Sequence, residues 1–143
     1  MYKFPIEFEF SSTANDRYSD AWSSVSFDFE ATACDVPKKF NGMGNGFSPE
    51  ELFGMSLLNC FVATYKYYCM QSELTFDKLK ARGTLIVDRN TDGQPCMQKF
   101  ILVVTLFSVS DVAQAQKLFL DAEKNCFIKN SVKTECDFSL VIT

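Results

Sequence analysis

The stretch that decides the fold spans residues 48–63 and reads SPEELFGMSLLNCFVA. Ser48 is a typical N-cap residue, Pro49 is favoured at the first helical position, and Glu51 completes a capping box three residues after the cap. Beyond Glu51 the stretch is apolar on nearly every face of a helix. We therefore predict a long helix that begins here, ends near Gln71 and packs on more than one side.

Two runs of alternating apolar and polar residues precede this helix. They span residues 4–10 and 24–30, and residues 15–17, Asn-Asp-Arg, lie between them. A period of two is typical of strands with one buried face, and the Asn-Asp-Arg segment favours a turn. The runs predict a hairpin, followed by a Gly-rich loop over residues 41–46.

The second half of the chain predicts another hairpin, a second helix and a closing strand. The hairpin strands are expected over residues 74–88 and 97–109. Ser110 or Asp111 caps the second helix, and the final strand covers residues 136–142. The resulting order is ββ-α-ββ-α-β, an α+β fold with antiparallel sheets around a long central helix, in a single domain over residues 1–143.

Composition and charge exclude several classes of partner. The 143 residues carry a net charge of −4 without any basic run, which argues against nucleic acid or an anionic membrane as a partner. The first residues lack the apolar core of a signal peptide, and no apolar stretch is long enough to span a membrane, so a cytoplasmic location is expected. With 47% hydrophobic residues, the chain is apolar enough that we expect part of its surface to meet a second chain.

The spacing of the cysteines matches no known disulfide or zinc-binding pattern. There are six, without a CxxC pair or a zinc-ligand spacing, so free thiols are expected, and neither a metal nor a cofactor is predicted. The chain has no histidine, which excludes Cys-His and Ser-His catalysis and imidazole metal sites. Any activated thiol here must be activated by another group.

Cys60 is the thiol that we single out. A cysteine in an apolar helix is ordinarily a small core residue, and we keep that interpretation for Cys69 and Cys136. Cys60 differs because a second cysteine, Cys126, stands where the second predicted helix ends. Two thiols carried by helices are what a peroxidatic and a resolving cysteine require.

Two segments resemble a known family. Residues 47–61, FSPEELFGMSLLNCF, are similar to the signature of the OsmC/Ohr family, in which a Pro-Glu-(Glu/Gln)-Leu helix start precedes the reactive cysteine at this spacing. Residues 122–132, AEKNCFIKNSV, resemble the segment that holds the family's resolving cysteine. The resemblance implies an intertwined homodimer in which each long helix is buried between sheets and the active sites lie at the subunit interface.

The resemblance also implies a mechanism and its residues. Cys60 attacks an organic hydroperoxide and becomes a sulfenic acid, Cys126 resolves it as a disulfide, and an external dithiol, possibly on a lipoylated protein, reduces that disulfide. In the family a glutamate holds an arginine that supports the thiolate. Glu50 matches the glutamate, and the arginine is either Arg17, which we favour because a guanidinium grips a carboxylate bidentately, or is replaced by Lys39.

Helix geometry bears on this site. Glu50 and Cys60 are ten residues apart, which is roughly 15 Å along one helix, too far for one arginine to bridge comfortably. If Glu50, Arg17 and Cys60 form one site, part of it is expected to come from a second chain whose long helix packs antiparallel about a twofold axis.

Three alternatives stay open. Phe127 follows Cys126 where the family usually has proline, so Cys60 could instead be resolved by an external thiol. The chain could also be a divergent, non-catalytic OsmC-like dimer that binds a small apolar ligand, or a purely structural dimer. Phe53, Phe61 and Phe127 would favour organic over inorganic peroxides if they line the site, and are otherwise ordinary core residues.

Overall fold

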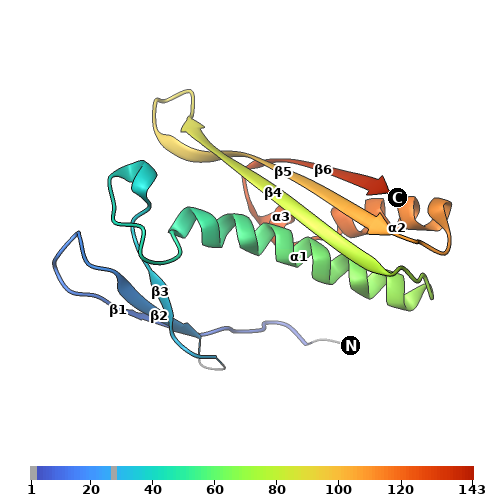
Figure 1. Cartoon of the computed structure of the whole chain (residues 1–143), viewed down its shortest axis with the longest axis horizontal. Helices are drawn as coiled ribbons and strands as arrows, with labels where there is room; N and C mark the ends of the chain where they lie inside the picture. Colours follow the sequence, from blue (N-terminus) through green and yellow to red (C-terminus); the bar gives the residue numbers. More distant parts are fainter. Residues whose placement is uncertain (1–2, 27–28) are drawn as a thin grey trace. The chain divides into compact units, whose positions relative to one another are not determined.

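The predicted capping box is present and begins the long helix α1, Pro49–Gln71. In this computed structural model the backbone N–H of Ser48 donates to Glu51 Oε2 at 2.8 Å, and the N–H of Glu51 donates to Ser48 Oγ at 3.1 Å. Each side chain thus satisfies a backbone donor that the first helical turn leaves free. The structure describes residues 3–26 and 29–143 (Figure 1).

The chain divides into two compact units, Met1–Leu52 and Phe53–Thr143. The first turn of α1 belongs to the first unit and the rest of the helix to the second. Each unit is described by itself, and a single domain over residues 1–143 stays a prediction.

The first unit holds a three-stranded antiparallel sheet in the order β1-β2-β3, with β1 at Phe10–Thr13, β2 at Trp22–Ser26 and β3 at Thr32–Cys34. The predicted hairpin is the β1–β2 pair, with Phe10 opposite Ser26. Strand β3 was not predicted, because three residues are too few to show a period.

The expected first strand over residues 4–10 is wrong in its extent. Strand β1 begins only at Phe10, and Phe4 and Phe8 are exposed. In the described part of the chain no strand pairs with residues 4–9, so their alternating pattern has no face to bury. Residues 27 and 28 of the expected second strand lie outside the described residues.

A loop held by a buried carboxylate joins β3 to α1. Asp35 is fully buried and accepts the backbone N–H groups of Val36 at 2.7 Å and Asn45 at 2.9 Å. The loop includes a short 3₁₀ helix, η1, at Lys38–Phe40. Gly46 is needed because a Cβ there would lie 2.5 Å from the carbonyl oxygen of Ala33.

The second unit contains a sheet in the order β4-β5-β6, with β4 at Lys78–Arg89, β5 at Pro95–Phe107 and β6 at Glu135–Ile142. Strands β4 and β5 form the predicted antiparallel hairpin, but β6 runs parallel to β5. The expectation of purely antiparallel sheets is therefore wrong. Two helices connect β5 to β6 and return the chain to the end at which β5 started, as a parallel pair requires.

Those connecting helices are α2, Val112–Lys124, and α3, Phe127–Ser131. Asp111 caps α2 by accepting the N–H of Gln114 at 2.9 Å, as predicted. None of the helices in the described parts of the chain has the length and apolar character that a membrane span requires.

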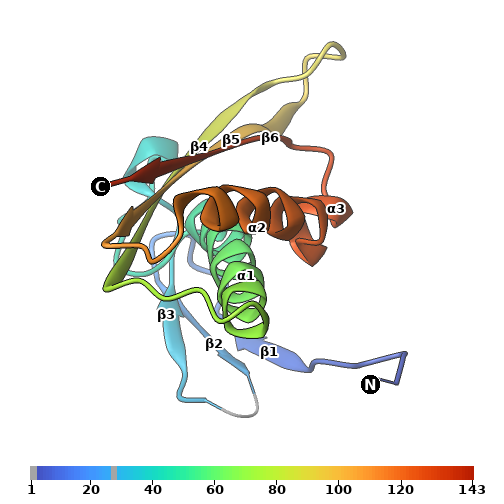
Figure 2. The ribbon, with the colours of Figure 1, turned by 90° about the vertical axis from the view of Figure 1, so that its right-hand side faces the viewer.

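Helices α1 and α2 lie side by side on one face of the second sheet (Figure 2). Most of the buried core comes from one stripe of each helix and from alternate residues of β5: Leu57, Phe61, Tyr65, Cys69, Ala115, Leu118, Phe119, Ala122, Phe100, Leu102, Val104 and Leu106. The Tyr65 hydroxyl donates to the carbonyl of Ala115 at 3.0 Å and so ties α1 to α2.

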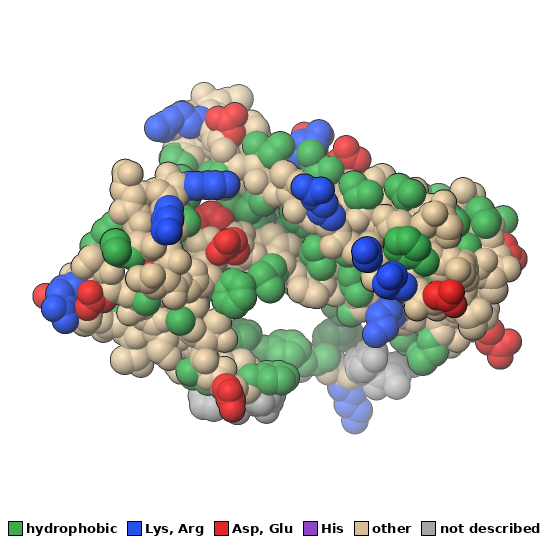
Figure 3. All heavy atoms as spheres, in the orientation of Figure 1, with side chains coloured by type: hydrophobic (Ala, Val, Ile, Leu, Met, Phe, Trp, Pro, Cys, Tyr) green, Lys and Arg blue, Asp and Glu red, His purple; other side chains and the backbone are tan. Residues whose placement is uncertain are grey.

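In the second unit only one stripe of α1 is fully buried. Met55, Tyr67 and Met70 on the same helix are exposed, and hydrophobic side chains stand among lysines and arginines on the surface of this unit (Figure 3). The fold is α+β with two sheets and a long helix, as predicted. The second surface that we expected to cover α1 is not supplied by the second unit.

Candidate active site

Two cysteines that are far apart in the sequence meet in the second unit. Cys60, half-buried on α1, packs against the core beside Phe61, and Cys126, fully buried, lies between α2 and α3. The Cys60 thiol lies close enough to the Cys126 thiol to help raise the pKa of Cys126, and both thiols are free. The structure therefore brings together the two thiols that the sequence analysis singled out.

Local structure explains where Cys126 lies. Asn125 ends α2, and its side chain donates back to the carbonyl of Asp121 at 2.8 Å. Cys126 is then the N-cap residue of α3, with an extended backbone. This extended residue separates the two helices, and its thiol is fully buried while Phe127 is 71% exposed.

The surroundings of Cys126 keep its thiol protonated. Burial raises the pKa of Cys126 to about 11; the backbone N–H groups of Lys129 and Ile128 oppose that rise, and the nearby Cys60 thiol adds to it. At neutral pH the Cys126 sulfur therefore carries its proton, while Cys60 is the more accessible member of the pair.

Glu50 has an unusual environment for a carboxylate. It is half-buried, and its Oε2 atom is buried without a hydrogen-bonding partner among the described residues. A buried carboxylate oxygen left unpaired costs free energy, so this atom is suited to receive a strong donor such as a guanidinium.

Arg17 lies in the connection between β1 and β2. Its Nε is 3.1 Å from Asp20 Oδ2 and its side chain is 72% exposed. In the described part of the chain its ion-pair partner is thus Asp20, not Glu50. Lys39, the alternative cation, is exposed in η1. The roles of Arg17 and Glu50 in a common site stay predictions.

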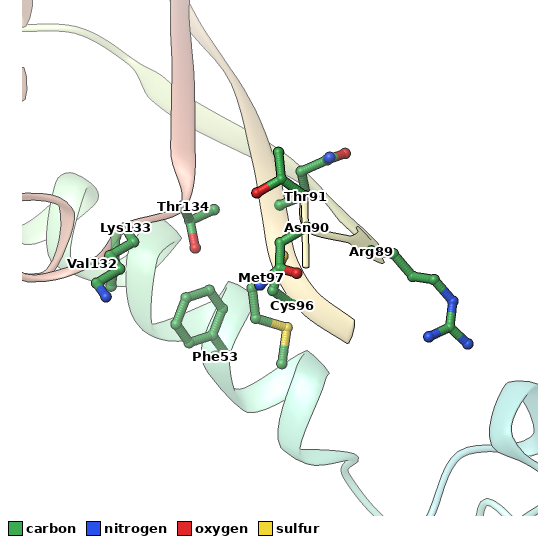
Figure 4. Close-up of a pocket in the computed structure, with 10 residues that line it drawn as sticks. Phe53, Arg89, Asn90, Thr91, Cys96, Met97, Val132, Lys133 and Thr134 are labelled. Atoms are coloured by element: carbon green, nitrogen blue, oxygen red, sulfur yellow. The ribbon is translucent and has the colours of Figure 1, made fainter. Parts of the chain in front are cut away.

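An open pocket of about 710 Å³ lies in the second unit (Figure 4). Phe53, seven residues before Cys60, projects into it from α1, so the two side chains share one face of the helix two turns apart. The other lining residues come from the end of β4, the β4–β5 turn, the start of β5 and the segment before β6: Arg89, Asn90, Thr91, Cys96, Met97, Gln98, Val132, Lys133 and Thr134. The sequence analysis named only Phe53 here.

The three phenylalanines considered earlier differ in their surroundings. Phe61 is a core residue whose ring lies 4.9 Å from Phe119 and 5.3 Å from Phe138, between centroids. Phe53 lines the pocket, and Phe127 faces solvent. Across the described residues, no group of three or more His, Cys, Asp or Glu side chains could hold a metal ion.

Comparison with known proteins identifies the family. The model of the OsmC-like protein family matches residues 42–141, well over half of the chain. The chain belongs to the OsmC-like family. The matched region includes Glu50 and both cysteines of the pair.

Solved OsmC-like structures share the whole fold. An OsmC-like protein of unknown function from Vibrio cholerae superposes with a TM-score of 0.85 at 19% identity, covering 96% of this chain and 100% of its own. The organic hydroperoxide resistance protein OhrB of Bacillus subtilis superposes with a TM-score of 0.71 at 19% identity, covering 96% and 98%. In sequence, the uncharacterized protein YmaD of Bacillus subtilis is 29% identical over 114 residues, 76% of this chain and 75% of YmaD.

Proposed function

We propose that this OsmC-like protein is a cysteine-based thiol peroxidase that reduces organic hydroperoxides. The observation that carries the proposal is that the half-buried Cys60 thiol lies near the buried Cys126 thiol, although the two residues are 66 positions apart in the sequence. Two adjacent free thiols of unequal accessibility match the two steps of the reaction, because peroxide must reach the first thiol and be kept from the second.

The reaction balances as follows. The Cys60 thiolate attacks the terminal oxygen of R–O–O–H, the O–O bond breaks, and with one proton the products are a Cys60 sulfenic acid and the alcohol ROH. The Cys126 thiol then condenses with the sulfenic acid to give a disulfide and water. An external dithiol reduces that disulfide and is itself oxidised, which returns both cysteines to thiols.

The pocket beside Phe53 supports an organic substrate. It lies on the face of α1 that carries Cys60, and Phe53 and Met97 offer apolar surface to the substituent of a peroxide. Hydrogen peroxide has no such substituent and gains nothing from this surface. The name of OhrB, an organic hydroperoxide resistance protein, is consistent with this preference.

Activation of Cys60 is assigned to Arg17 and Glu50 in a homodimer. The chain has no histidine, and the buried Oε2 of Glu50 lacks a donor among the described residues. The Arg17 side chain is mostly exposed and forms a surface ion pair with Asp20, and such pairs contribute little to stability. We propose that in the dimer Arg17 pairs with a Glu50 carboxylate and stabilises the charge on the leaving oxygen.

Arg17→Lys tests this role. If the guanidinium acts mainly in the transition state, the variant loses about tenfold or more in peroxide reduction while the rate of Cys60 alkylation by iodoacetamide changes much less. Equal losses in both rates would show that Arg17 affects only thiolate formation. Lys39→Gln is the matched control, and it is expected to keep both rates.

The proposed function is tested by stopped-flow consumption of cumene hydroperoxide and of hydrogen peroxide with dihydrolipoamide as reductant. We expect turnover in wild type, with a preference for cumene hydroperoxide, and complete loss of turnover in Cys60→Ser. In Cys126→Ser each Cys60 should reduce one peroxide molecule and then stay oxidised, because no Cys60–Cys126 disulfide forms for the dithiol to reduce. Cys34→Ser is the control, because Cys34 is a buried cysteine that neither lines the pocket nor belongs to the thiol pair. Absence of turnover with any dithiol would exclude the peroxidase.

The same pocket also favours one alternative function, that of a non-catalytic dimer that binds a small apolar ligand. It predicts saturable binding of cumyl alcohol, the product of cumene hydroperoxide reduction, without any peroxide consumption. We expect the affinity for cumyl alcohol to fall in Phe53→Ala and to be unchanged in Cys60→Ser.

A further inference from the structure

We propose that Glu123 and Lys129 form a clasp around Cys126 that positions this thiol for disulfide formation with Cys60. The inference rests on the proposed peroxidase and concerns its second step. Neither residue takes part in the chemistry at the two sulfur atoms, so both are positioning residues.

The clasp is symmetric about Cys126 in the sequence. Glu123 lies three residues before it, in the last turn of α2, and Lys129 lies three residues after it, in α3. Lys129 Nζ is 3.2 Å from Glu123 Oε1, and the two side chains are only 24% and 25% exposed. The ion pair joins the two ends of a seven-residue segment that has Cys126 at its centre.

A second pair of contacts closes the same turn. The Asn130 side chain donates to the carbonyl of Lys124 at 2.9 Å, and the Asn130 backbone N–H donates to the carbonyl of Cys126 at 3.0 Å. These two bonds fix the backbone on either side of Cys126. The ion pair adds the side-chain contact that holds α3 against the end of α2.

The clasp also contacts the cluster that holds Cys60. Lys129 Nζ lies 5.8 Å from the centroid of the Phe138 ring, and Phe138 packs edge-on against Phe61, the residue that follows Cys60. Lys129 therefore links the clasp to the aromatic cluster beside Cys60. The other ion pair of this unit, Lys99–Glu135 at 3.5 Å, is more exposed and joins β5 to β6 rather than α2 to α3.

Geometry makes the second step sensitive to such a shift. A disulfide forms only when the two sulfurs reach about 2.05 Å with Cα atoms about 4.4–6.8 Å apart. Because the condensation is intramolecular, its rate depends on how well the thiol is held, and a misplacement of about 1 Å can cost about a hundredfold. Oxidation of Cys60 by peroxide does not need Cys126 in place, so the clasp should act on resolution alone.

The experiment separates the two steps in the full chain. One equivalent of cumene hydroperoxide is added without reductant; Cys60 sulfenic acid is trapped with dimedone at successive times, and the Cys60–Cys126 disulfide is quantified by mass spectrometry. The variants are Glu123→Gln, Lys129→Met, the charge swap Glu123→Lys/Lys129→Glu, and Glu135→Gln as the matched control. Circular dichroism before oxidation shows whether each variant is folded.

We expect both single variants to oxidise Cys60 at the wild-type rate and to form the disulfide about tenfold more slowly or worse, with longer-lived sulfenic acid. The swap restores most of the resolution rate, and Glu135→Gln changes neither step. Wild-type resolution in folded single variants, or a swap no better than either single change, overturns the clasp alone. If wild type forms neither a Cys60 sulfenic acid nor the Cys60–Cys126 disulfide, the proposed function and the clasp fall together.

Discussion

Cys126 shows how strongly one residue's chemistry depends on its position in the fold. The thiol is completely buried, and this raises its pKa to about 11, although two backbone N–H groups of α3 favour its ionised form. A resolving thiol that stays protonated is protected from direct reaction with peroxide. It also links the stability of the fold to pH, since the unfolded chain releases this proton more readily.

The pH dependence of unfolding follows from this shift. The ordinary pKa of a cysteine thiol is about 9. Below that pH, Cys126 is protonated in both the folded and the unfolded chain, and its contribution to stability is fully present. That contribution is lost as the pH rises toward 11. Between about pH 8.5 and 10.5 we expect wild type to lose on the order of 1–2 kcal/mol more than Cys126→Ser, measured by urea unfolding with reductant present. Parallel pH profiles for the two proteins would contradict this assignment.

Single residues also show how far the sequence predicts the site. Cys60 and Cys126 could be paired in advance because each has a defined place on a predicted helix. Glu123 and Lys129 could not, because residues six apart do not face each other on one helix and meet only where α2 turns into α3. The guanidinium of Arg17 is likewise not positioned by any local pattern.

At the scale of elements, predictions succeeded where periodicity is long and failed where topology decides. The predicted start of α1 at the capping box and its predicted end near Gln71 both agree with the structure. Strand β3 and helix α3 have three and five residues, too few to show a period. The parallel pairing of β6 depends on where the α2–α3 connection returns the chain, which no strand pattern reveals.

Packing between β4 and β5 gives a test at this scale. Gly83 on β4 faces the ring of Phe100, and a Cβ there would lie 2.7 Å from Phe100 Cζ. Gly83→Ala must therefore displace a core ring, and we expect it to lower the free energy of unfolding by about 1–3 kcal/mol in denaturant titrations.

Gly54 provides the matched comparison on α1. A Cβ at this position would lie 3.7 Å from Phe100 Cε2, which is ordinary contact with the same ring. Alanine also has the higher helix propensity, so Gly54→Ala is expected to raise the free energy of unfolding by up to about 1 kcal/mol. Similar losses in both glycine variants would show that Phe100 does not set the difference.

At the scale of the whole molecule, exposed apolar surface favours a second chain. Phe4, Phe8 and Phe10 are 73%, 77% and 73% exposed, and α1 leaves Met55 and Met70 exposed as well. Exposed apolar residues in such numbers mark interaction surfaces more often than free surface. Together with the distance between Glu50 and Cys60 along α1, they support the homodimer proposed here.

The oligomeric state is therefore expected to govern activity. Sedimentation velocity should show a dimer at micromolar concentration, and peroxidase activity per chain should fall when dilution produces monomer. Phe8→Glu and Met55→Glu are expected to weaken the dimer and the activity together, whereas Glu135→Gln changes neither. A stable monomer with full activity would contradict the shared site.

The central claim is that Cys60 and Cys126 form the redox pair, and peptide mapping after oxidation by one equivalent of cumene hydroperoxide tests it most directly. We predict a single Cys60–Cys126 disulfide in wild type and a dimedone-trapped sulfenic acid on Cys60 in Cys126→Ser, with the other four cysteines still reduced. Oxidation that begins at Cys34 or Cys96, or that leaves Cys60 a thiol, would contradict the account.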